Sequence, residues 1–515
     1  MTPIQLLVFT LIVGLLFITR TVYRTLDDTT YSSDALVHLL IAREIRENGY
    51  RIPTSIEDTV VPGEFSYPFL AHYILAVVPE PYYETVDRYA SFGFDLLFIG
   101  LFFILYRIQV LDFFEMTVAS FVFIATPQLV RIDRPHGTGF SPRKFGSFLT
   151  SVSLLLFLYW LSTGVVVYFI ASVVTGSGIL LTSRFSTQAY TAILVCFSVL
   201  LSPQAIIVLL LSFLLSFLTT RGFYFQLIRS HLLFSYRYAL TKQYDRLYDG
   251  FKSIDTVKRL LAVRSPKDLL RAIDNSILLR GFFDIPLLLP LIVGYVVAGR
   301  PAQVPNGFSL WIVICLGLFV LTSVYHLRFL GGAERYLEFA LLPAITIVAK
   351  WIGSGGVVYT VVVVLSMAVG LSVIVVSMYF VTSQPATEDR KNLMDAINQL
   401  NTFEPGTVLC SPRHIGRLVT WKTPHTAVAY AGQGPTSMRH LSERNYLFPD
   451  GRNPTADIGW LTKNFSPDLL LVRTDQEVGE ECLQIPETAP LYANRSFHIY
   501  RFESLVKEAN KGSNG

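Results

Sequence analysis

An acidic residue and a histidine stand one helical turn apart in the first long polar stretch of the chain. Within TLDDTTYSSDALVHLLIAREIRENGYRIP, residues Ser33 to Asn48 carry apolar residues at helical spacing, and Gly49 follows as a stop signal. Asp34 and His38 therefore share one face of a predicted helix. A carboxylate in such a position can orient or deprotonate a hydroxyl group, or hold a divalent cation. The residues alone leave open that Asp34 is an N-cap and that His38 is a packing residue.

A second polar stretch, TPQLVRIDRPHGTGFSPRKFGS, gathers positive charge. It holds one acid, Asp133, and its basic residues include Arg131, Arg134, Arg143 and Lys144. Guanidinium groups offer paired donors to phosphate oxygens, so this stretch is suited to holding a phosphate group. In the alternative interpretation Asp133 forms an ion pair with a neighbouring arginine, while Arg143 and Lys144 flank the next apolar run.

A third polar cluster lies between two late apolar runs. The segment RFLGGAERYLEFALLP contains Arg335 and Tyr336. In one interpretation this loop faces the same side of the membrane as Asp34. If it faces the other side, Arg335 is an anchor at the membrane surface.

The composition indicates that these polar stretches connect membrane spans. Of 515 residues, 52% are hydrophobic and only 16% are charged, against roughly 25% charged in an ordinary soluble domain. Several stretches are apolar enough to cross a hydrocarbon core as helices. A net charge of +4 without a lysine-rich tail argues against nucleic acid as a partner. The sequence therefore predicts an α-helical polytopic membrane protein.

The first spans place the two early polar stretches outside the cell membrane. The run Pro3 to Ile18 is interpreted as a retained signal anchor, so residues 20–88 form the first outer loop. Spans at Ala90–Tyr106 and Phe113–Thr126 follow, and residues 127–144 form the second outer loop.

The number of later spans depends on one break. The run Gln188–Leu218 is interrupted by Ser202-Pro203-Gln204, which suits either a tight hairpin or a kink. Two spans there give about eleven in all and an outer C-terminal domain, the interpretation we favour. One span gives about ten and a cytoplasmic tail. The remaining predicted spans are Phe145–Leu161, Val165–Leu181, Phe282–Val297, Leu310–Tyr325, Leu337–Ile352 and Val357–Val381.

From Gln384 the composition becomes that of a soluble domain. Short runs rich in β-forming residues alternate with helical stretches, which predicts a small α/β domain over residues 384–515, after a membrane domain over residues 1–383. The predicted strands are Thr407–Cys410, Thr426–Tyr430, Leu469–Val472 and Phe497–Tyr500, and the predicted helices include Asp389–Leu400 and Thr455–Phe465. The chain contains no GxxxxGK[ST], GxGxxG or HExxH motif.

The order of these features resembles the GT-C superfamily of membrane glycosyltransferases, which use sugars linked to polyprenyl phosphate. YSSDALVHLLIAREIRENG is similar to the first-loop acidic motif of oligosaccharyltransferase catalytic subunits and protein mannosyltransferases. EFSYPFLAHYILAVVPE is similar to the proline-rich segment that closes this loop, although Tyr67-Pro68-Phe69-Leu70 has a single proline. The segment around Arg335 and Tyr336 resembles an Arg-Tyr element before a terminal span in such enzymes.

The resemblance implies a function and a set of site residues. Asp34 corresponds to the family's catalytic acidic residue, as a base or an acceptor-orienting group, and Asp133 is the candidate for the family's second acidic position. The residues that would bind the donor phosphate are His38, Arg131, Arg134, Arg143, Lys144, Arg335 and Tyr336. The expected reaction is an inverting transfer from a polyprenyl- or dolichyl-phosphate sugar to a glycan, protein or lipid acceptor at the outer face.

No cofactor follows with certainty from the sequence. Some relatives resemble metal-dependent enzymes, so a divalent cation, Mg²⁺ or Mn²⁺, is left open, although Asp34 without a paired carboxylate favours none. Two other function classes also stay open: a lipid-linked glycan flippase or exporter, which should carry charges within its spans, and a noncatalytic scaffold for cell-surface glycan assembly, in which Asp34 would be replaceable.

Overall fold

The structure of the chain is a computed structural model. It describes residues 2–26, 33–61, 63–131, 139–241, 261–265, 268–269, 272–273, 276–297, 304–323, 327, 330–382, 388–449, 453–455, 457–474 and 489–506.

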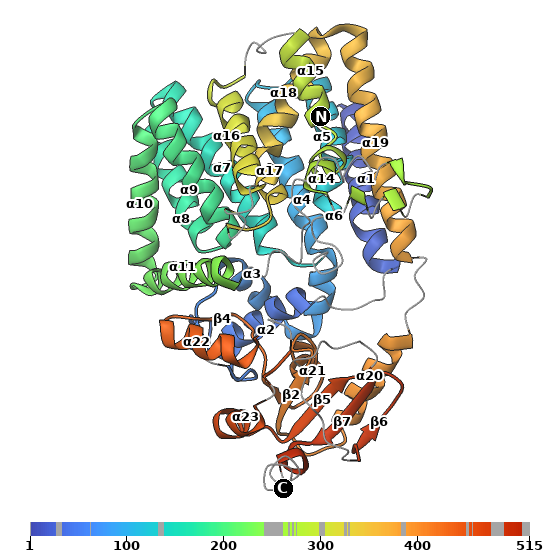
Figure 1. The fold of residues 1–515 in the computed structure, drawn as a ribbon. Coiled ribbons are helices and arrows are strands. Elements are labelled where there is room, and N and C mark those ends of the chain that lie inside the picture. The colour runs from blue at the N-terminus through green and yellow to red at the C-terminus, as the bar shows by residue number, and fades with distance from the viewer. Residues whose placement is uncertain are drawn as a thin grey trace. The chain divides into compact units, whose positions relative to one another are not determined.

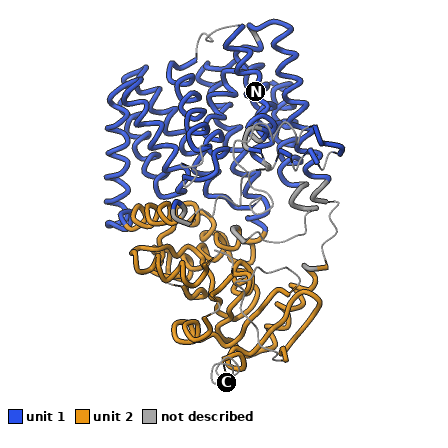
Figure 2. Tube along the Cα trace, viewed as in Figure 1, with its two compact units in different colours: residues 1–28, 85–225, 238–383 blue, residues 29–84, 226–237, 384–515 orange. Residues whose placement is uncertain are grey.

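The chain forms two compact units, drawn in different colours in Figure 2. Unit 1 contains residues 1–28, 85–225 and 238–383, and unit 2 contains residues 29–84, 226–237 and 384–515. The sequence predicts that the first outer loop, residues 20–88, belongs to the membrane domain. In the structure most of it packs in the same unit as the C-terminal segment.

Unit 1 is a bundle of helices (Figure 1). Its long helices are α1 (Pro3–Leu26), α4 (Tyr83–Arg107), α5 (Phe113–Ile124), α7 (Pro142–Thr163), α8 (Val166–Leu180), α9 (Arg184–Leu200), α10 (Gln204–Thr219), α16 (Gly307–Ser323), α18 (Leu341–Ser354) and α19 (Gly356–Thr382). Shorter elements are α6 (Gln128–Arg131), α14 (Ile277–Asp284), α15 (Leu288–Val297), α17 (Glu334–Leu337) and η4 (Glu338–Ala340).

Several of these helices are suited to a membrane. Among the described residues, four helices are long and apolar enough to cross one, or five if the bent pair Gln204–Thr219 and Phe223–Arg237 is one span. Four shorter apolar helices of 10–17 residues accompany them. The prediction of a polytopic helical membrane protein is confirmed, whereas the total of ten or eleven spans stays a prediction.

Two breaks in the apolar runs lie at prolines. Pro203 separates α9 from α10, and these two helices pack side by side with α8 (Figure 1), as expected of a hairpin. The predicted single span Phe282–Val297 is wrong, because Pro286 follows α14 and the chain restarts as α15 at Leu288. Proline has no N–H to donate and disfavours helical geometry in the residue before it.

Unit 2 is built on a five-stranded sheet of order β3-β2-β5-β7-β6. The strands are β2 (Thr407–Ser411), β3 (Thr426–Ala427), β5 (Leu469–Arg473), β6 (Tyr492–Ala493) and β7 (Phe497–Arg501). β2 pairs in parallel with β3 and β5, and β7 pairs antiparallel with β5 and β6. The predicted α/β domain is confirmed.

Helices cover both faces of this sheet because side chains alternate along each strand. On one face Val408 and Cys410 of β2 pack with α20 (Glu388–Leu400) and α21 (Ile415–Lys422). On the other face Leu409 packs with α22 (Met438–Leu447) and α23 (Ile458–Phe465).

The first outer loop is an integral part of unit 2. Its helices are α2 (Ser33–Glu47), which ends before Gly49 at φ +63° as predicted, and α3 (Leu70–Val77). The strand β1 (Glu64–Phe65) pairs antiparallel with β4 (Gln433–Gly434), and Leu36 of α2 belongs to the core of the C-terminal segment.

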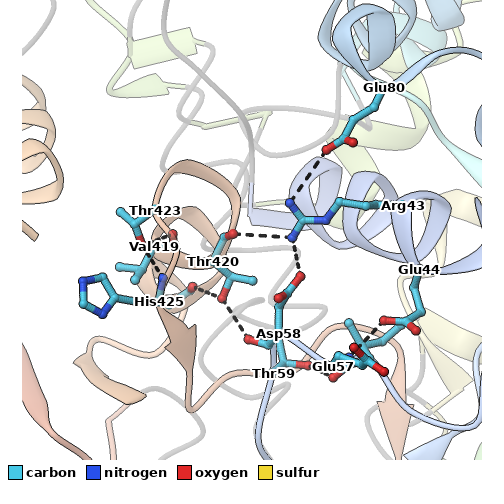
Figure 3. Close-up of polar contacts among 12 residues, drawn as sticks. Arg43, Glu44, Glu57, Asp58, Thr59, Glu80, Val419, Thr420, Thr423 and His425 are labelled. Atoms are coloured by element: carbon cyan, nitrogen blue, oxygen red, sulfur yellow. Dashed lines mark hydrogen bonds and ion pairs between the residues drawn. The ribbon is translucent and has the colours of Figure 1, made fainter. Parts of the chain in front are cut away.

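Arg43 of α2 joins the loop to α21 (Figure 3). Its guanidinium donates to Asp58 Oδ2 and, at 3.5 Å, to the carbonyl of Thr420. The Thr420 hydroxyl in turn donates to the carbonyl of Asp58 at 3.3 Å, and Arg43 also lies 5.1 Å above the Trp421 ring. These contacts fix α2, and thus the predicted catalytic segment, against the C-terminal fold.

Candidate functional site

Asp34 lies in the first turn of α2, one residue after the helix begins at Ser33. Its backbone is helical, while its side chain lies outside the described part of the chain. A carboxylate in the first turn of a helix is stabilised by the positive end of the helix dipole, which favours its ionised form. The predicted helical spacing of Asp34 and His38 is present.

His38 is buried against a second histidine. Its Nδ1 lies 2.9 Å from Nε2 of His72 in α3, and the Tyr67 ring packs on both imidazoles, with centroids 6.0 and 5.6 Å away. Burial lowers the pKa of His38 to about 3, and the positive charge of Arg417 adds to this effect. Burial and the neighbouring His38 also hold the pKa of His72 well below its usual value. Both rings are therefore neutral at physiological pH, so His38 can offer a hydrogen bond there but no charge.

The middle of the second outer loop lies outside the described residues. This applies to Asp133 and Arg134, and also to the side chain of Arg131, whose backbone ends α6. The two ends of the loop are described, and they carry Arg143 and Lys144 in the first turn of α7.

Arg143 pairs with an acid from the late part of the chain. Its Nε donates to Glu338 Oε2 at 3.0 Å, and the two side chains are 12% and 4% exposed. Glu338 begins η4, directly after the α17 segment that holds Arg335 and Tyr336. The structure thus joins two segments that the sequence analysis selected independently for phosphate binding.

The Lys144 side chain is buried between α4 and the start of the second outer loop. Its Nζ donates to Ser91 Oγ and, at 2.7 Å, to the carbonyl of Leu129, and it lies 4.0 Å from Asp95 Oδ2. The same carboxylate accepts from Arg20 Nε at 2.6 Å. The charge of Lys144 is therefore held inside unit 1.

Arg335 and Tyr336 contact residues at the start of α9. The Arg335 guanidinium lies 4.6 Å from the centroid of the Phe185 ring. The Tyr336 hydroxyl is 3.1 Å from Gln188 Oε1 and 3.2 Å from the carbonyl of Leu330. These contacts fix the orientation of both side chains.

The sequence analysis missed Asp87, which fixes the end of the second outer loop. Asp87 is 2% exposed, and its Oδ1 accepts the backbone N–H of Phe140 at 2.6 Å. Gly139 lies so close that an added Cβ would stand 2.1 Å from Oδ1. An acid within the first turns of an apolar helix, followed later by a glycine, was the available signal, but no local spacing connects residues 87 and 139.

A divalent cation needs several oxygen or nitrogen ligands. The described residues contain no group of three or more His, Cys, Asp or Glu side chains placed to hold one. The side chains of Asp34 and Asp133 lie outside the residues to which this statement applies.

The fold resembles that of solved glycosyltransferases. A crystal structure of the Archaeoglobus fulgidus oligosaccharyltransferase, in complex with Zn and sulfate, matches this chain with TM-score 0.55 and 12% identity. The match covers 90% of this chain and 68% of the oligosaccharyltransferase chain. The oligosaccharyltransferase AglB from Archaeoglobus fulgidus, in complex with an inhibitory peptide and a dolichol-phosphate, matches 92% of this chain and 69% of the AglB chain, with TM-score 0.54 and 10% identity. ArnT from Cupriavidus metallidurans in the apo state matches 96% of this chain and 98% of its own, with TM-score 0.46 and 14% identity.

No protein-family model matches the sequence, and no curated protein matches it. The likeness therefore establishes the fold. AglB is a GT-C superfamily membrane glycosyltransferase, so the GT-C fold expected from the sequence is confirmed.

Proposed function

We propose that this chain is a membrane glycosyltransferase that transfers a sugar from a polyprenyl-phosphate-linked donor to an acceptor. The observation that carries the proposal is the GT-C fold over 90% of the chain together with an acidic residue, Asp34, in the first turn of the first-loop helix. Activity is not implied by fold alone, so the proposal rests on this acid being in the position where the resemblance expects the catalytic acid.

The proposed reaction is a single displacement at the anomeric carbon. The Asp34 carboxylate accepts the proton of the acceptor hydroxyl. The acceptor oxygen forms the new bond to the anomeric carbon, while the bond from that carbon to the phosphate oxygen breaks. The electron pair leaves with the lipid phosphate, and the configuration at the anomeric carbon is inverted.

The leaving lipid phosphate needs positive charge and hydrogen-bond donors. We assign this role to Arg143, Lys144 and Arg335, with Arg131 and Arg134 of the second loop. Tyr336 would donate a hydrogen bond from its hydroxyl to this phosphate. Asp133 would be the second acidic residue of the site and would assist Asp34. Arg143 is held by Glu338, so a phosphate bound there would share or displace that carboxylate.

The solved relative supports the donor class. One solved structure is of AglB in complex with an inhibitory peptide and a dolichol-phosphate. A polyprenyl or dolichyl phosphate sugar is accordingly the donor class we propose, with a glycan, protein or lipid as acceptor. We also propose that the C-terminal domain lies on the outer side of the cell membrane, where such an acceptor would be met.

The test is transfer of radiolabelled sugar from individual polyprenyl-phosphate donors to acceptors in membranes that contain the full chain. Asp34→Asn and Asp34→Ala should each lower transfer by at least about a hundredfold, because general-base catalysis contributes roughly 10²–10⁴-fold. Asp34→Asn keeps the size of the side chain and its place in α2, and it removes the base.

Glu47→Gln is the matched control, because it neutralises an acid at the other end of the same helix. It should transfer at the native rate at equal protein level. Full transfer by Asp34→Asn would remove Asp34 from the mechanism. No transfer by the native chain from any donor would favour an exporter or a scaffold.

A further inference from the structure

Four arginines from three separate parts of the sequence converge in unit 2. Arg413 lies two residues before α21 and Arg417 in its first turn, Arg444 lies on α22, and Arg237 lies on α11 (Phe223–Thr241). We call these four residues the arginine cluster. Arg237 and Arg444 are 3% and 6% exposed, which is unusual for arginine.

The cluster lies at the carboxyl ends of the parallel strands β2 and β3, where ligands commonly bind in α/β sheets. β2 ends at Ser411, two residues before Arg413, and β3 ends at Ala427, three residues before Tyr430. The chain passes from β2 to β3 on one side and later to β5 on the other side of β2. In open α/β sheets the crevice at the carboxyl ends of strands, where the connections diverge in this way, is the usual ligand site.

Tyr430 is the centre of the cluster. The guanidinium carbon of Arg444 lies 3.6 Å from its ring centroid and that of Arg413 lies 5.5 Å away. Arg417 Nε donates to the Tyr430 carbonyl at 2.8 Å. Phe448 completes the wall beside Arg413, at 5.3 Å. The aromatic rings hold the guanidinium groups in place without neutralising them.

The positive charges repel one another. Burial lowers the pKa of Arg413 to about 9, and the charges of Arg444, Arg417 and Arg237 add to this effect. Within the described part of the chain, neither Arg413 nor Arg444 pairs with a carboxylate. Holding Arg413 and Arg444 against the same ring without a carboxylate on either of them costs free energy, so this pair of charges favours an anion.

Donors are also available for such an anion. Arg413 Nη1, Arg444 Nε and the Tyr430 hydroxyl are buried and have no hydrogen-bond partner among the described residues. Arg413 and Arg417 are partly exposed, so part of each of these two side chains lies at the surface. Two guanidinium groups and a hydroxyl can surround a tetrahedral oxyanion.

We propose that Arg413, Arg444 and Tyr430, with Arg417 and Arg237 around them, form a binding site for a phosphate group in the C-terminal unit. These residues belong to unit 2, whereas the basic residues assigned above belong to unit 1. The proposal of this site rests on the geometry of unit 2 alone and does not depend on the proposed transfer reaction. The phosphate can belong to a lipid carrier or to a soluble phosphate compound.

The test is the binding of inorganic pyrophosphate to the purified full chain in detergent. Binding is measured by isothermal titration calorimetry at a fixed chloride concentration. Arg413→Gln and Arg444→Gln should each weaken binding by about tenfold or more, since a hydrogen bond to a charged group contributes about 1.5–3 kcal/mol. Arg413→Lys keeps the charge without the paired donors and should show an intermediate loss.

Arg439→Gln is the matched control, because Arg439 lies on the same helix as Arg444 with its side chain 85% exposed. It should bind pyrophosphate like the native chain. Because Arg413→Gln removes a repelling charge, its melting temperature without anion should equal or exceed the native value, and this measurement separates lost binding from lost folding.

The source of the phosphate follows from a second titration in nanodiscs of zwitterionic lipid. Competition by added polyprenyl phosphate assigns the site to the lipid carrier, whereas undiminished pyrophosphate binding assigns it to a soluble phosphate compound. Native-level binding by both Arg413→Gln and Arg444→Gln, or no binding by the native chain, would overturn the proposal. Neither result would bear on Asp34, whose transfer assay is separate.

Discussion

The Arg444 guanidinium carbon lies 3.6 Å from the centroid of the Tyr430 ring, and the Tyr430 hydroxyl has no hydrogen-bond partner among the described residues. The tyrosine therefore serves the arginine mainly as an aromatic surface. Burial raises the pKa of Tyr430, so the hydroxyl stays protonated at neutral pH and can donate to a bound anion.

This relationship predicts different outcomes for two substitutions at Tyr430. Tyr430→Phe should leave the melting temperature unchanged or raise it, because a buried unpaired hydroxyl costs about 1–3 kcal/mol. Tyr430→Ala should lower stability by about 3–5 kcal/mol through lost packing. Thermal unfolding in anion-free buffer measures both. A loss in Tyr430→Phe as large as that in Tyr430→Ala would show that the hydroxyl is bonded in the native protein.

The neutral pair of His38 and His72 predicts a pH dependence of stability. The native pKa of His38, about 3, lies below its usual 6.5, so the unfolded chain binds more protons between these values. Stability is therefore full above pH 6.5 and is lost as the pH falls from there towards 3, by up to about 1.4 kcal/mol per pH unit for each such histidine.

The measurement is the melting temperature between pH 7.5 and pH 5 for the native chain and for His38→Gln. The variant should lose less stability on acidification, since it has one fewer histidine to protonate. His414→Gln, at an exposed position, is the control and should follow the native curve. An equal acid loss in His38→Gln and the native chain would contradict the buried neutral pair.

The sequence predicted the local elements of the fold well where periodicity and stop signals agree. The α2 segment, with Gly49 after it, and the strands around Val408 and Leu470 lie where their patterns indicate. Each of these elements is specified by residues within about a dozen positions of one another.

Contacts between distant segments could not be predicted in this way. Arg143 and Glu338 are 195 residues apart, and Arg237 approaches α21 and α22 only through the fold. Arginine is most often a surface residue, so nothing near Arg413 or Arg444 in the sequence indicated burial. The predicted span Phe282–Val297 missed the break at Pro286 because the apolar run continues across the proline. Hydropathy does not depend on whether a residue has a backbone N–H to donate.

The chemistry of the carboxylates predicts how transfer responds to removal of divalent cations. Asp34 has no second acid within one helical turn, and Asp133 is the single acid of residues 127–144. Tight sites for Mg²⁺ or Mn²⁺ gather several oxygen ligands. We therefore expect sugar transfer in EDTA-washed membranes to equal that in untreated membranes. Loss of transfer that is restored by Mg²⁺ or Mn²⁺ would contradict this and assign Asp34 and Asp133 as ligand candidates.

Substitutions in the ion pair of Arg143 and Glu338 can distinguish whether Arg143 binds the donor phosphate or only stabilises the fold. Both side chains are largely buried, and breaking a buried pair typically costs about 3–5 kcal/mol. Arg143→Gln and Glu338→Gln should each lower the melting temperature. The double variant should lose less than the sum of the two, because each single change leaves its partner charge buried.

Transfer kinetics should distinguish the two single variants. If Arg143 holds the donor phosphate, Arg143→Gln should raise the KM for the lipid-linked donor by about tenfold or more. Glu338→Gln should leave that KM unchanged or lower it, since Arg143 then has no carboxylate competing with the phosphate. The assay compares initial rates over a range of donor concentrations at matched protein level. An equal rise of KM in both variants would show that Arg143 acts by holding α7 against η4 and does not contact the donor.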